Sequence, residues 1–293
     1  MVACRQGDVD AALRTGARAP HAAGLQRALA QALVALGRTG DAADVLRRAL
    51  ALKPDLELFE ALTATLMPGP SYYQHLQWLQ ELARPNAYLE IGVWYGQSLG
   101  LAKPPTRAFG VDPDPKLDRA GLTAETRIYP MTSDAFFAEL PWLAQVGAVA
   151  FDLAFIDGLH LFEQVLRDFV NVERHCSPDG IVVFHDTLPP VAIAAERAPA
   201  GPFWCGDVWK ILPCLERYRP DLRIVTLPTA PSGLSIVTGL NPGSTVLADR
   251  FDEAVAEIGA LPFAVLDQRL PELIARRSND RNETARAIGI ASS

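Results

Sequence analysis

The chain has 293 residues, of which 49% are hydrophobic and 21% are charged, and its formal net charge is −7. This length suits one large domain with a small appendage, and the hydrophobic fraction is sufficient for a substantial core. The acidic balance argues against nucleic acid as a partner, because phosphate binding needs a basic surface, and no apolar run approaches the roughly 18 residues of a membrane helix.

Two features predict a cytoplasmic protein. Residues 1–10 lack the basic start and the apolar stretch of a signal peptide. The four cysteines are scattered without Cys-x-x-Cys spacing, at Cys4, Cys176, Cys205 and Cys214. We expect free thiols in a reducing compartment, with a disulfide between Cys205 and Cys214 as the less favoured alternative.

The N-terminal part of the chain has the pattern of two antiparallel helices. Residues 22–36 and 41–52 carry apolar residues at helical spacing around a glycine-containing turn. We expect Asp41 to cap the second helix and Pro54 to end it. The small and apolar positions between residues 22 and 54 resemble one tetratricopeptide repeat.

A lone repeat cannot bury its apolar face unaided. Residues 56–66 predict one further helix, so residues 1–68 form a small all-α extension. We expect this extension to dock on the second domain or on another copy of the chain, which would make a homo-oligomer.

From residue 69 onward, apolar strands alternate with helices. Strands are predicted at residues 87–93, 107–111, 126–129, 153–157, 180–184, 222–227 and 233–239. Helices are predicted at residues 71–83, 97–102, 133–140, 162–176, 207–218, 251–259 and 267–277. This alternation predicts an α/β domain over residues 69–278, with a Rossmann-like, doubly wound, mostly parallel seven-stranded sheet that ends in an antiparallel hairpin. The polar residues 279–293 are expected to form a flexible tail.

The end of the first predicted strand suits a nucleoside cofactor. Glu90 lies in the strand, and Gly92 and Gly96 allow the backbone to turn sharply. Asp112 ends the next strand, at the place where α/β folds hold ribose hydroxyls. The turn lacks the third glycine of Gly-x-Gly-x-x-Gly. Glu90 would also repel a diphosphate but attract the ammonium and sulfonium groups of S-adenosylmethionine.

Acidic residues also end the fourth and fifth predicted strands. Asp157 follows one and Asp186 follows the other, directly after His185. The carboxyl ends of parallel strands meet in one crevice, so we expect these side chains to converge. Their ligand atoms suit Mg²⁺, with Mn²⁺ as the alternative. Adjacent strand residues point to opposite faces, so His185 and Asp186 share a site only if the strand has already ended.

Taken in order, these motifs resemble the class I S-adenosylmethionine-dependent methyltransferases, in particular the bacterial metal-dependent sugar and macrolide O-methyltransferases. The resemblance covers residues 71–240 and implies methyl transfer to a hydroxyl of a sugar or another small molecule. It implies cofactor binding by Glu90, Gly92, Gly96, Ser98, Asp112, Ser133 and Asp134. It implies metal binding by Asp157, Asp186 and His185, and catalysis by His185, Asp157 and His160.

Some roles stay open on the sequence alone. His185 is either a metal ligand or the general base, and His160 is base, ligand or loop filler. Ser133 either lies by the adenine or caps the helix that follows it. The long segment 187–207 suggests a lid or substrate wall, with Phe203, Trp204 and Trp209 lining an acceptor pocket.

Two rival functions remain. A nucleotide-sugar or NAD-dependent α/β enzyme shares the fold, but Glu90 and the missing glycine argue against it. A helical-repeat adaptor with an inactive methyltransferase-like domain is the non-enzymatic alternative, against which Glu90, Asp112, Asp157 and Asp186 argue.

Overall fold

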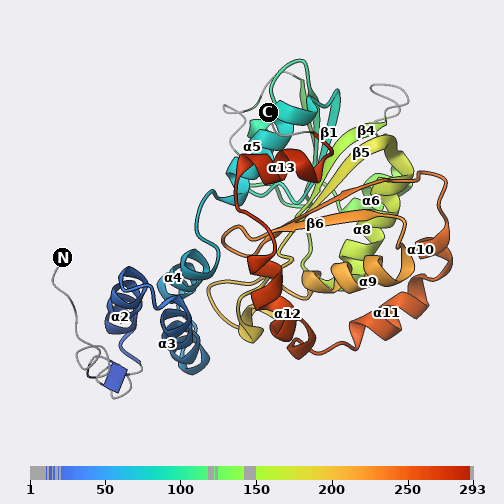
Figure 1. The fold of residues 1–293 in the computed structure, drawn as a ribbon. Helices are drawn as coiled ribbons and strands as arrows, with labels where there is room; N and C mark the ends of the chain where they lie inside the picture. The colour runs from blue at the N-terminus through green and yellow to red at the C-terminus, as the bar shows by residue number, and fades with distance from the viewer. Residues whose placement is uncertain are drawn as a thin grey trace.

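The computed structural model describes residues 21–117, 125–141 and 150–290, together with residues 11, 13, 14, 16, 19 and 122. It consists of a small helical unit beside an α/β domain (Figure 1). Cys4 lies outside the described residues. Among the residues that the structure describes, no helix has both the length and the apolar character needed to cross a membrane.

The centre of the α/β domain is a seven-stranded sheet in the order β3-β2-β1-β4-β5-β7-β6. Its strands are β1 (Ala87–Ile91), β2 (Arg107–Val111), β3 (Thr126–Tyr129), β4 (Phe151–Ile156), β5 (Cys176–His185), β6 (Arg223–Leu227) and β7 (Leu234–Thr238). The pairs among β1 to β5 are parallel, whereas β7 is antiparallel to both β5 and β6. The predicted Rossmann-like, mostly parallel seven-stranded fold is therefore confirmed.

The register of the central strands brings their carboxyl ends to one level. Ile91 of β1 pairs with Val111 of β2 and with Ile156 of β4. The chain order reverses between β1 and β4, and ligands of open α/β sheets bind in the crevice at such a point. Gly92, Asp112 and Asp157, which follow the paired residues, therefore begin at the same edge of that crevice.

Helices cover both faces of the sheet, as the double-sided burial of its strands requires. One face packs against α6 (Ser133–Glu139), α8 (Phe162–His175), α9 (Ile211–Tyr218) and α11 (Phe251–Gly259). The other face packs against α5 (Tyr72–Ala83) and α13 (Arg281–Ala287). Shorter or peripheral elements are η1 (Leu99–Leu101), η3 (Ala192–Ala195), η4 (Val208–Lys210), α10 (Val246–Asp249) and α12 (Ala264–Ala275).

The helical unit consists of α2 (Ala23–Ala35), α3 (Thr39–Leu52) and α4 (Leu56–Leu66). The prediction that Asp41 caps the second helix is wrong, because α3 begins two residues earlier and Asp41 instead accepts a hydrogen bond from Arg38 at 2.6 Å. The side chain of Asp55 caps α4 by accepting from the N–H of Leu58.

The apolar face of the helical unit is covered by the same chain. Its core continues into the segment 187–207, from which Ala194, Phe203 and Cys205 are buried among the helices. Docking on the second domain was one of the two arrangements expected for a lone repeat. Association with another copy stays a prediction.

The expectation of a flexible tail does not hold for residues 279–290. Asp280 caps α13, and Thr284, Ala285 and Ala287 are buried. His75 of α5 lies between this segment's Thr284 and Asn279, at 2.7 and 2.5 Å from their side-chain oxygens. Asn279 and Thr284 therefore pair with α5, whereas Arg281, Asn282 and Arg286 are exposed.

Candidate functional site

A cavity of about 890 Å³ opens at the carboxyl ends of β1, β2, β4 and β5. It is lined by most of the residues that the sequence predicts for the site: Gly92, Ser98, Asp112, Ser133, Asp134, Asp157, His160, His185 and Asp186. Glu90 and Gly96 are not among its lining residues. Nine of the eleven residues that the sequence predicts for the site therefore line one cavity, as the convergence of parallel strands led us to expect.

The turn after β1 depends on its glycines. Gly92 has a φ of +87°, and a Cβ atom there would lie 2.0 Å from the carbonyl oxygen of Asp157. Gly96 has a φ of +75° and shapes the far end of the same turn. A side chain at Gly92 would therefore push the cofactor turn away from the end of β4.

Asp112 holds this turn as well as facing the cavity. Its Oδ2 accepts hydrogen bonds from the N–H groups of Val93 and Trp94, both at 2.9 Å. Its Oδ1 accepts from the N–H of Asp114 at 2.8 Å. Each carboxylate oxygen has more than one acceptor site, so the group can accept further hydrogen bonds from a ligand in the cavity.

Glu90 lies behind the cavity wall. Its side chain is fully buried, and it accepts hydrogen bonds from the hydroxyls of Tyr88 at 2.5 Å and Ser98 at 2.7 Å. Burial raises the pKa of Glu90 to about 8, although these hydrogen bonds oppose the shift. Since Ser98 lines the cavity and Glu90 does not, Glu90 can reach a ligand in the cavity only through Ser98 or through water.

The loop after β3 borders the cavity on another side. Ser133 does not cap α6, because the cap is Thr132, whose hydroxyl accepts from the N–H of Ala135. Gln164 of α8, a residue that the sequence did not suggest, also lines the cavity. Its amide donates to Ser133 at 3.2 Å and to Asp134 at 3.1 Å, which joins α8 to this loop.

Asp157, His160 and Asp186 form a compact cluster between β4 and β5. One ligand atom from each lies within 4.8 Å of the other two. His160 Nε2 is 3.6 Å from Asp157 Oδ1, and His160 Nδ1 is 3.4 Å from Asp186 Oδ2. Two carboxylates and one imidazole make a donor set that fits a divalent cation.

His185 joins this cluster because β5 ends there. Asp186, the next residue, has a φ of +59°, a left-handed conformation that is uncommon outside glycine. This turn in the backbone lets both side chains face the site, with His185 Nδ1 at 3.2 Å from Asp157 Oδ1 and at 3.5 Å from Asp186 Oδ1. The condition expected for a shared site, that the strand has already ended, is therefore met.

Two residues missed by the sequence analysis support the cluster. Ser232 donates a hydrogen bond from its hydroxyl to Asp186 Oδ1. The ring of Tyr72 lies over His185, with centroids 4.2 Å apart. Both come from parts of the chain distant from β5, so no local pattern could have indicated them.

The carboxylates and imidazoles shift one another's pKa values. Burial lowers the pKa of His160, but the negative charges of Asp186 and Asp157 outweigh it and raise that pKa to about 9. Burial also lowers the pKa of His185, but the charges of Asp186 and Asp157 outweigh burial and raise this pKa. Burial would raise the pKa of Asp157, but the two histidines hold it below its usual range. The cluster thus favours charged carboxylates beside charged imidazoles.

Three consecutive residues of the segment 187–207 close the cavity on the acceptor side. The ring of Phe203 stacks on Phe59 of α4, and the ring of Trp204 lies 5.1 Å from that of His160. Cys205 is buried beside Asp186, and burial raises the pKa of its thiol. Phe203 and Trp204 line the cavity as expected.

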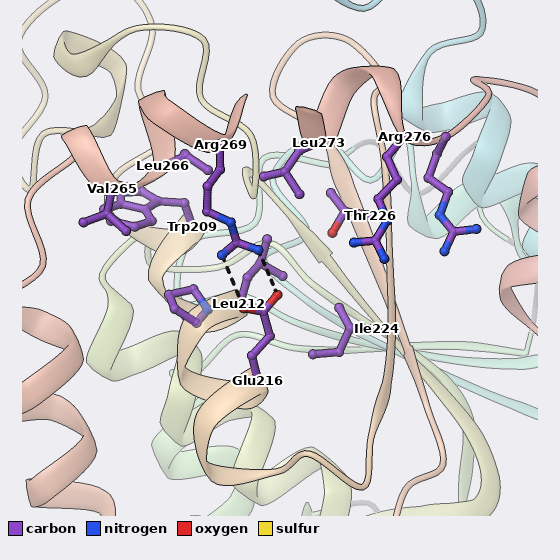
Figure 2. Close-up of a pocket in the computed structure, with 12 residues that line it drawn as sticks. Trp209, Leu212, Glu216, Ile224, Thr226, Val265, Leu266, Arg269, Leu273 and Arg276 are labelled. Carbon is purple, nitrogen blue, oxygen red and sulfur yellow. Dashed lines mark hydrogen bonds and ion pairs between the residues drawn. The ribbon is translucent and has the colours of Figure 1, made fainter. Parts of the chain in front are cut away.

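The prediction that Trp209 lines the acceptor pocket is wrong. Trp209 is buried against Leu266 and Leu270 of α12, since η4 turns its side chain to the outer side of the domain. It borders a smaller cavity of about 60 Å³ between α9, β6 and α12, where Arg269 is paired with Glu216 (Figure 2).

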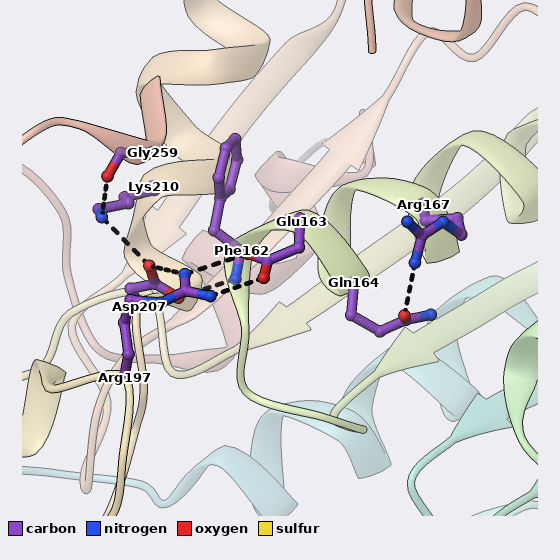
Figure 3. Close-up of polar contacts among 8 residues, drawn as sticks. All are labelled: Phe162, Glu163, Gln164, Arg167, Arg197, Asp207, Lys210 and Gly259. Atoms are coloured by element: carbon purple, nitrogen blue, oxygen red, sulfur yellow. Dashed lines mark hydrogen bonds and ion pairs between the residues drawn. The ribbon is translucent and has the colours of Figure 1, made fainter. Parts of the chain in front are cut away.

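Asp207 fixes the end of the segment 187–207 to α8 (Figure 3). It accepts hydrogen bonds from the N–H of Phe162 at 2.8 Å, from Arg197 at 2.7 Å and from Lys210 at 3.1 Å. Asp207 does not cap η4, the element that it precedes, because its side chain caps α8 instead. Arg197 also forms an ion pair with Glu163 of α8, so both Arg197 and Asp207 tie the segment to this helix.

Comparison with known proteins agrees with this geometry. Residues 89–187 match the family described as "Methyltransferase domain", and residues 23–65 match the family described as "Tetratricopeptide repeat". The chain carries a methyltransferase domain. The resemblance drawn from the motifs is therefore confirmed as that of a methyltransferase domain over residues 89–187 and of a tetratricopeptide repeat over residues 23–65.

Solved structures similar to the chain include several methyltransferases. The O-methyltransferase TomG from Streptomyces achromogenes, in complex with SAM, is 17% identical over 66% of this chain and 94% of its own, with a TM-score of 0.43. An O-methyltransferase from Bacillus cereus in complex with SAH is 14% identical over 66% of this chain and 96% of its own, with a TM-score of 0.46. The SAH-bound methyltransferase PaMTH1 from Podospora anserina is 15% identical over 62% of this chain and 86% of its own, with a TM-score of 0.44. No curated protein matches the chain.

Proposed function

We propose that this methyltransferase domain transfers a methyl group from S-adenosylmethionine to a hydroxyl of a sugar or another small molecule. The observation that carries the proposal is one continuous cavity with two chemically different halves. Gly92, Ser98 and Asp112 line one half, and Asp157, His185 and Asp186 line the other. A methyl donor and a hydroxyl acceptor need such adjacent sites.

The half at β1 and β2 suits the donor. Asp112 offers carboxylate oxygens to the two ribose hydroxyls, and Ser133 and Asp134 offer polar groups to the adenine edge. Ser98, backed by the buried Glu90, faces the methionyl part. The turn of Gly92 and Gly96 lets the backbone approach this part closely.

The half at β4 and β5 suits a divalent cation. Asp157, His160 and Asp186 would hold it, with His185 beside them. Two carboxylates suit Mg²⁺ or Mn²⁺, and the imidazole moves the preference from Mg²⁺ toward Mn²⁺. When bound, such an ion lowers the pKa of an acceptor hydroxyl.

His185 is the leading candidate for the general base. Its Nε2 is buried and has no hydrogen-bond partner in the described part of the chain. Its Nδ1 lies between Asp157 and Asp186, which fixes the ring and stabilises the imidazolium that forms when Nε2 accepts a proton. Asp186 and Asp157 raise the pKa of His185, and a positive sulfonium in the cavity would act against this rise and favour the neutral, proton-accepting form.

Cysteine chemistry supports a cytoplasmic location for this reaction. Cys176, Cys205 and Cys214 are free thiols, and all three are buried. No disulfide links Cys205 to Cys214, so the domain needs no oxidising compartment to fold.

Isothermal titration calorimetry with S-adenosylmethionine and with NAD tests the proposal. We expect binding of S-adenosylmethionine and of its demethylated product, and no measurable binding of NAD. Tight binding of NAD alone would reject the methyltransferase in favour of a dinucleotide-dependent enzyme. Binding of neither would favour the adaptor alternative.

A further inference from the structure

The helical unit contributes directly to the acceptor side of the cavity. Leu56, Phe59 and Glu60 of α4 are among the residues that line it. They lie there together with Phe203 and Trp204 of the segment 187–207. The cavity is therefore completed by an element outside the methyltransferase domain, whose family match covers residues 89–187.

Two consecutive residues, Phe203 and Trp204, link α4 to the cluster of Asp157, His160, His185 and Asp186. Phe203 stacks on Phe59 with ring centroids 4.1 Å apart and an interplanar angle of 8°. The next residue, Trp204, carries the carbonyl oxygen that lies 3.2 Å from His160 Nδ1. A molecule whose hydroxyl lies beside His160 and His185 thus has α4 within the same enclosure.

The charges around the cavity are mostly negative. The charged residues that line it, apart from histidines, are Glu60, Asp112, Asp114, Lys116, Asp134, Asp157 and Asp186. On the α4 side this charge comes from Glu60, an exposed residue whose carboxylate makes no hydrogen bond or ion pair with the described residues. An unpaired carboxylate at the cavity wall favours the binding of a cationic ligand and disfavours the binding of an anionic one.

The remaining wall at this place is apolar or aromatic. Phe59, Phe203 and Trp204 line the cavity here, with Phe59 and Phe203 stacked on each other and mostly buried, and Leu56 is 45% exposed. Flat ring compounds bury their surface well against such residues. A ring compound bound beside the cluster of Asp157, His160, His185 and Asp186 therefore shares one cavity with these apolar residues and with Glu60.

We propose that α4 and residues 203–205 form the acceptor subsite, and that Glu60 selects ring compounds with a protonated amine at the end remote from the reacting hydroxyl. The proposal rests on the proposed methyltransferase function and deepens it. The helical unit is then part of the enzyme's specificity, in addition to its packing role.

Three dihydroxyphenyl compounds of similar size test this selection. Dopamine carries a cationic ethylamine chain, 4-ethylcatechol a neutral ethyl chain, and 3,4-dihydroxyphenylacetate an anionic chain on the same ring. Transfer of labelled methyl from S-adenosylmethionine is measured for each as kcat/KM. We expect the order cation, neutral, anion, with about a tenfold span for one exposed charge interaction reinforced by the acidic cavity.

Glu60→Gln should shrink the span about threefold, and Glu60→Lys should reverse the order of dopamine and 3,4-dihydroxyphenylacetate. Affinity for S-adenosylmethionine, measured by calorimetry, should stay unchanged. Glu57→Gln is the matched control, because Glu57 lies on the same helix, pairs with Arg27 and does not line the cavity. Leu56→Ala should raise KM for all three compounds, since Leu56 is an apolar contact without charge.

The outcomes separate this proposal from the proposed function. An unchanged order in both Glu60 variants overturns the charge selection, and methylation of none of the three compounds overturns the ring-binding subsite. In either case, retained binding of S-adenosylmethionine leaves the methyltransferase function standing. If the unmodified protein does not bind S-adenosylmethionine, both the charge selection and the methyltransferase function are overturned.

Discussion

The rings of Phe59 and Phe203 lie parallel, 4.1 Å apart at their centroids, and join the N-terminal helices to the segment that follows β5. Gly201 lies against Pro54 in the same contact, where an added Cβ would come within 2.7 Å of the proline. The segment 187–207 is thus packed between two folding units. Its position depends on both of them.

We predict that Phe59 and Phe203 stabilise the protein cooperatively. Phe59→Leu and Phe203→Leu should each lower the free energy of unfolding by about 1 to 2 kcal/mol, because each removes a buried ring with partial repacking. The double variant should lose about 1 kcal/mol less than the sum, which is the energy of an aromatic pair beyond area burial. Urea unfolding followed by circular dichroism measures all three.

Leu36→Ala, at an exposed position of the helical unit, is the control and should change stability little. Additive losses in the double variant would show that the two rings do not interact. The helical unit would then be held by its other contacts alone.

The sequence predicted the strand-end residues well for a simple physical reason. Parallel strands deliver their carboxyl ends to one edge, so Asp112, Asp157 and Asp186 had to converge once the sheet was recognised. Ser232 and the α4 wall could not be predicted, because their place depends on packing between segments far apart in the chain. The left-handed backbone at Asp186 is likewise a tertiary effect, since non-glycine residues rarely adopt it.

The position of Glu90 could have been derived from the sequence. Side chains two residues apart on a strand share a face, so Glu90 shares a face with Tyr88, which is buried between the sheet and its helices. That alternation accounts for the contact of its carboxylate with Tyr88, whereas the contact with Ser98 depends on how the turn after β1 folds back. The charge pattern alone suggested that Glu90 holds the ammonium group of the cofactor, either directly or through water.

Asp112→Ala should lower the affinity for S-adenosylmethionine about 100-fold or more. The substitution removes the proposed acceptor for ribose hydroxyls, and it also releases the N–H groups of Val93 and Trp94 in the turn after β1. Calorimetry measures the change. Asp179→Ala is the control, since Asp179 is an exposed carboxylate near the opposite end of β5. Equal affinity in the two variants would contradict the ribose role.

Asp157→Asn and Asp186→Asn should leave the affinity for S-adenosylmethionine within about twofold and lower turnover by a factor of about 100 to 10,000. Both carboxylates position His185, and both belong to the candidate metal cluster, so the chemical step loses support without loss of the donor site. Calorimetry and labelled-methyl transfer measure the two effects separately.

Treatment with EDTA separates the two roles of these carboxylates. Turnover should fall and return when Mn²⁺ or Mg²⁺ is added, if the cluster holds a cation. Full turnover in chelated protein would reject the metal role and leave His185 as the leading base. His185→Gln should then be the variant with the greatest loss of turnover.

Glu90 should make the protein less stable as the pH rises toward neutrality. Burial, as the largest cause, raises its pKa from 4.5 to about 8, so between these values the folded state keeps a proton that the unfolded chain has lost. The free energy of unfolding should therefore fall by up to about 1.4 kcal/mol per pH unit in that window, and this stabilisation is gone above pH 8. Glu90→Gln, which keeps a neutral amide in this place, should flatten the slope between pH 6 and pH 8.

Thermal unfolding at several pH values measures this slope. Glu81→Gln serves as the control, because Glu81 is an exposed residue of α5 and should not change the slope. If the slopes of Glu90→Gln and the unmodified protein coincide, Glu90 titrates near its ordinary pKa and is not held neutral.

Asp207→Ala should destabilise the protein by about 3 kcal/mol or more. The side chain of Asp207 is 2% exposed, and its removal leaves the buried ammonium of Lys210 without its carboxylate and the N-terminus of α8 without its cap. Glu163→Ala removes only the more exposed carboxylate that pairs with Arg197, so it should cost less than about 1 kcal/mol. Urea unfolding compares the two. Since Asp207 is the last residue of the segment that carries Trp204 and Cys205, its loss should also raise KM for an acceptor more than it changes the affinity for S-adenosylmethionine. Equal effects of Asp207→Ala and Glu163→Ala on stability would mean that Asp207 does not anchor this segment.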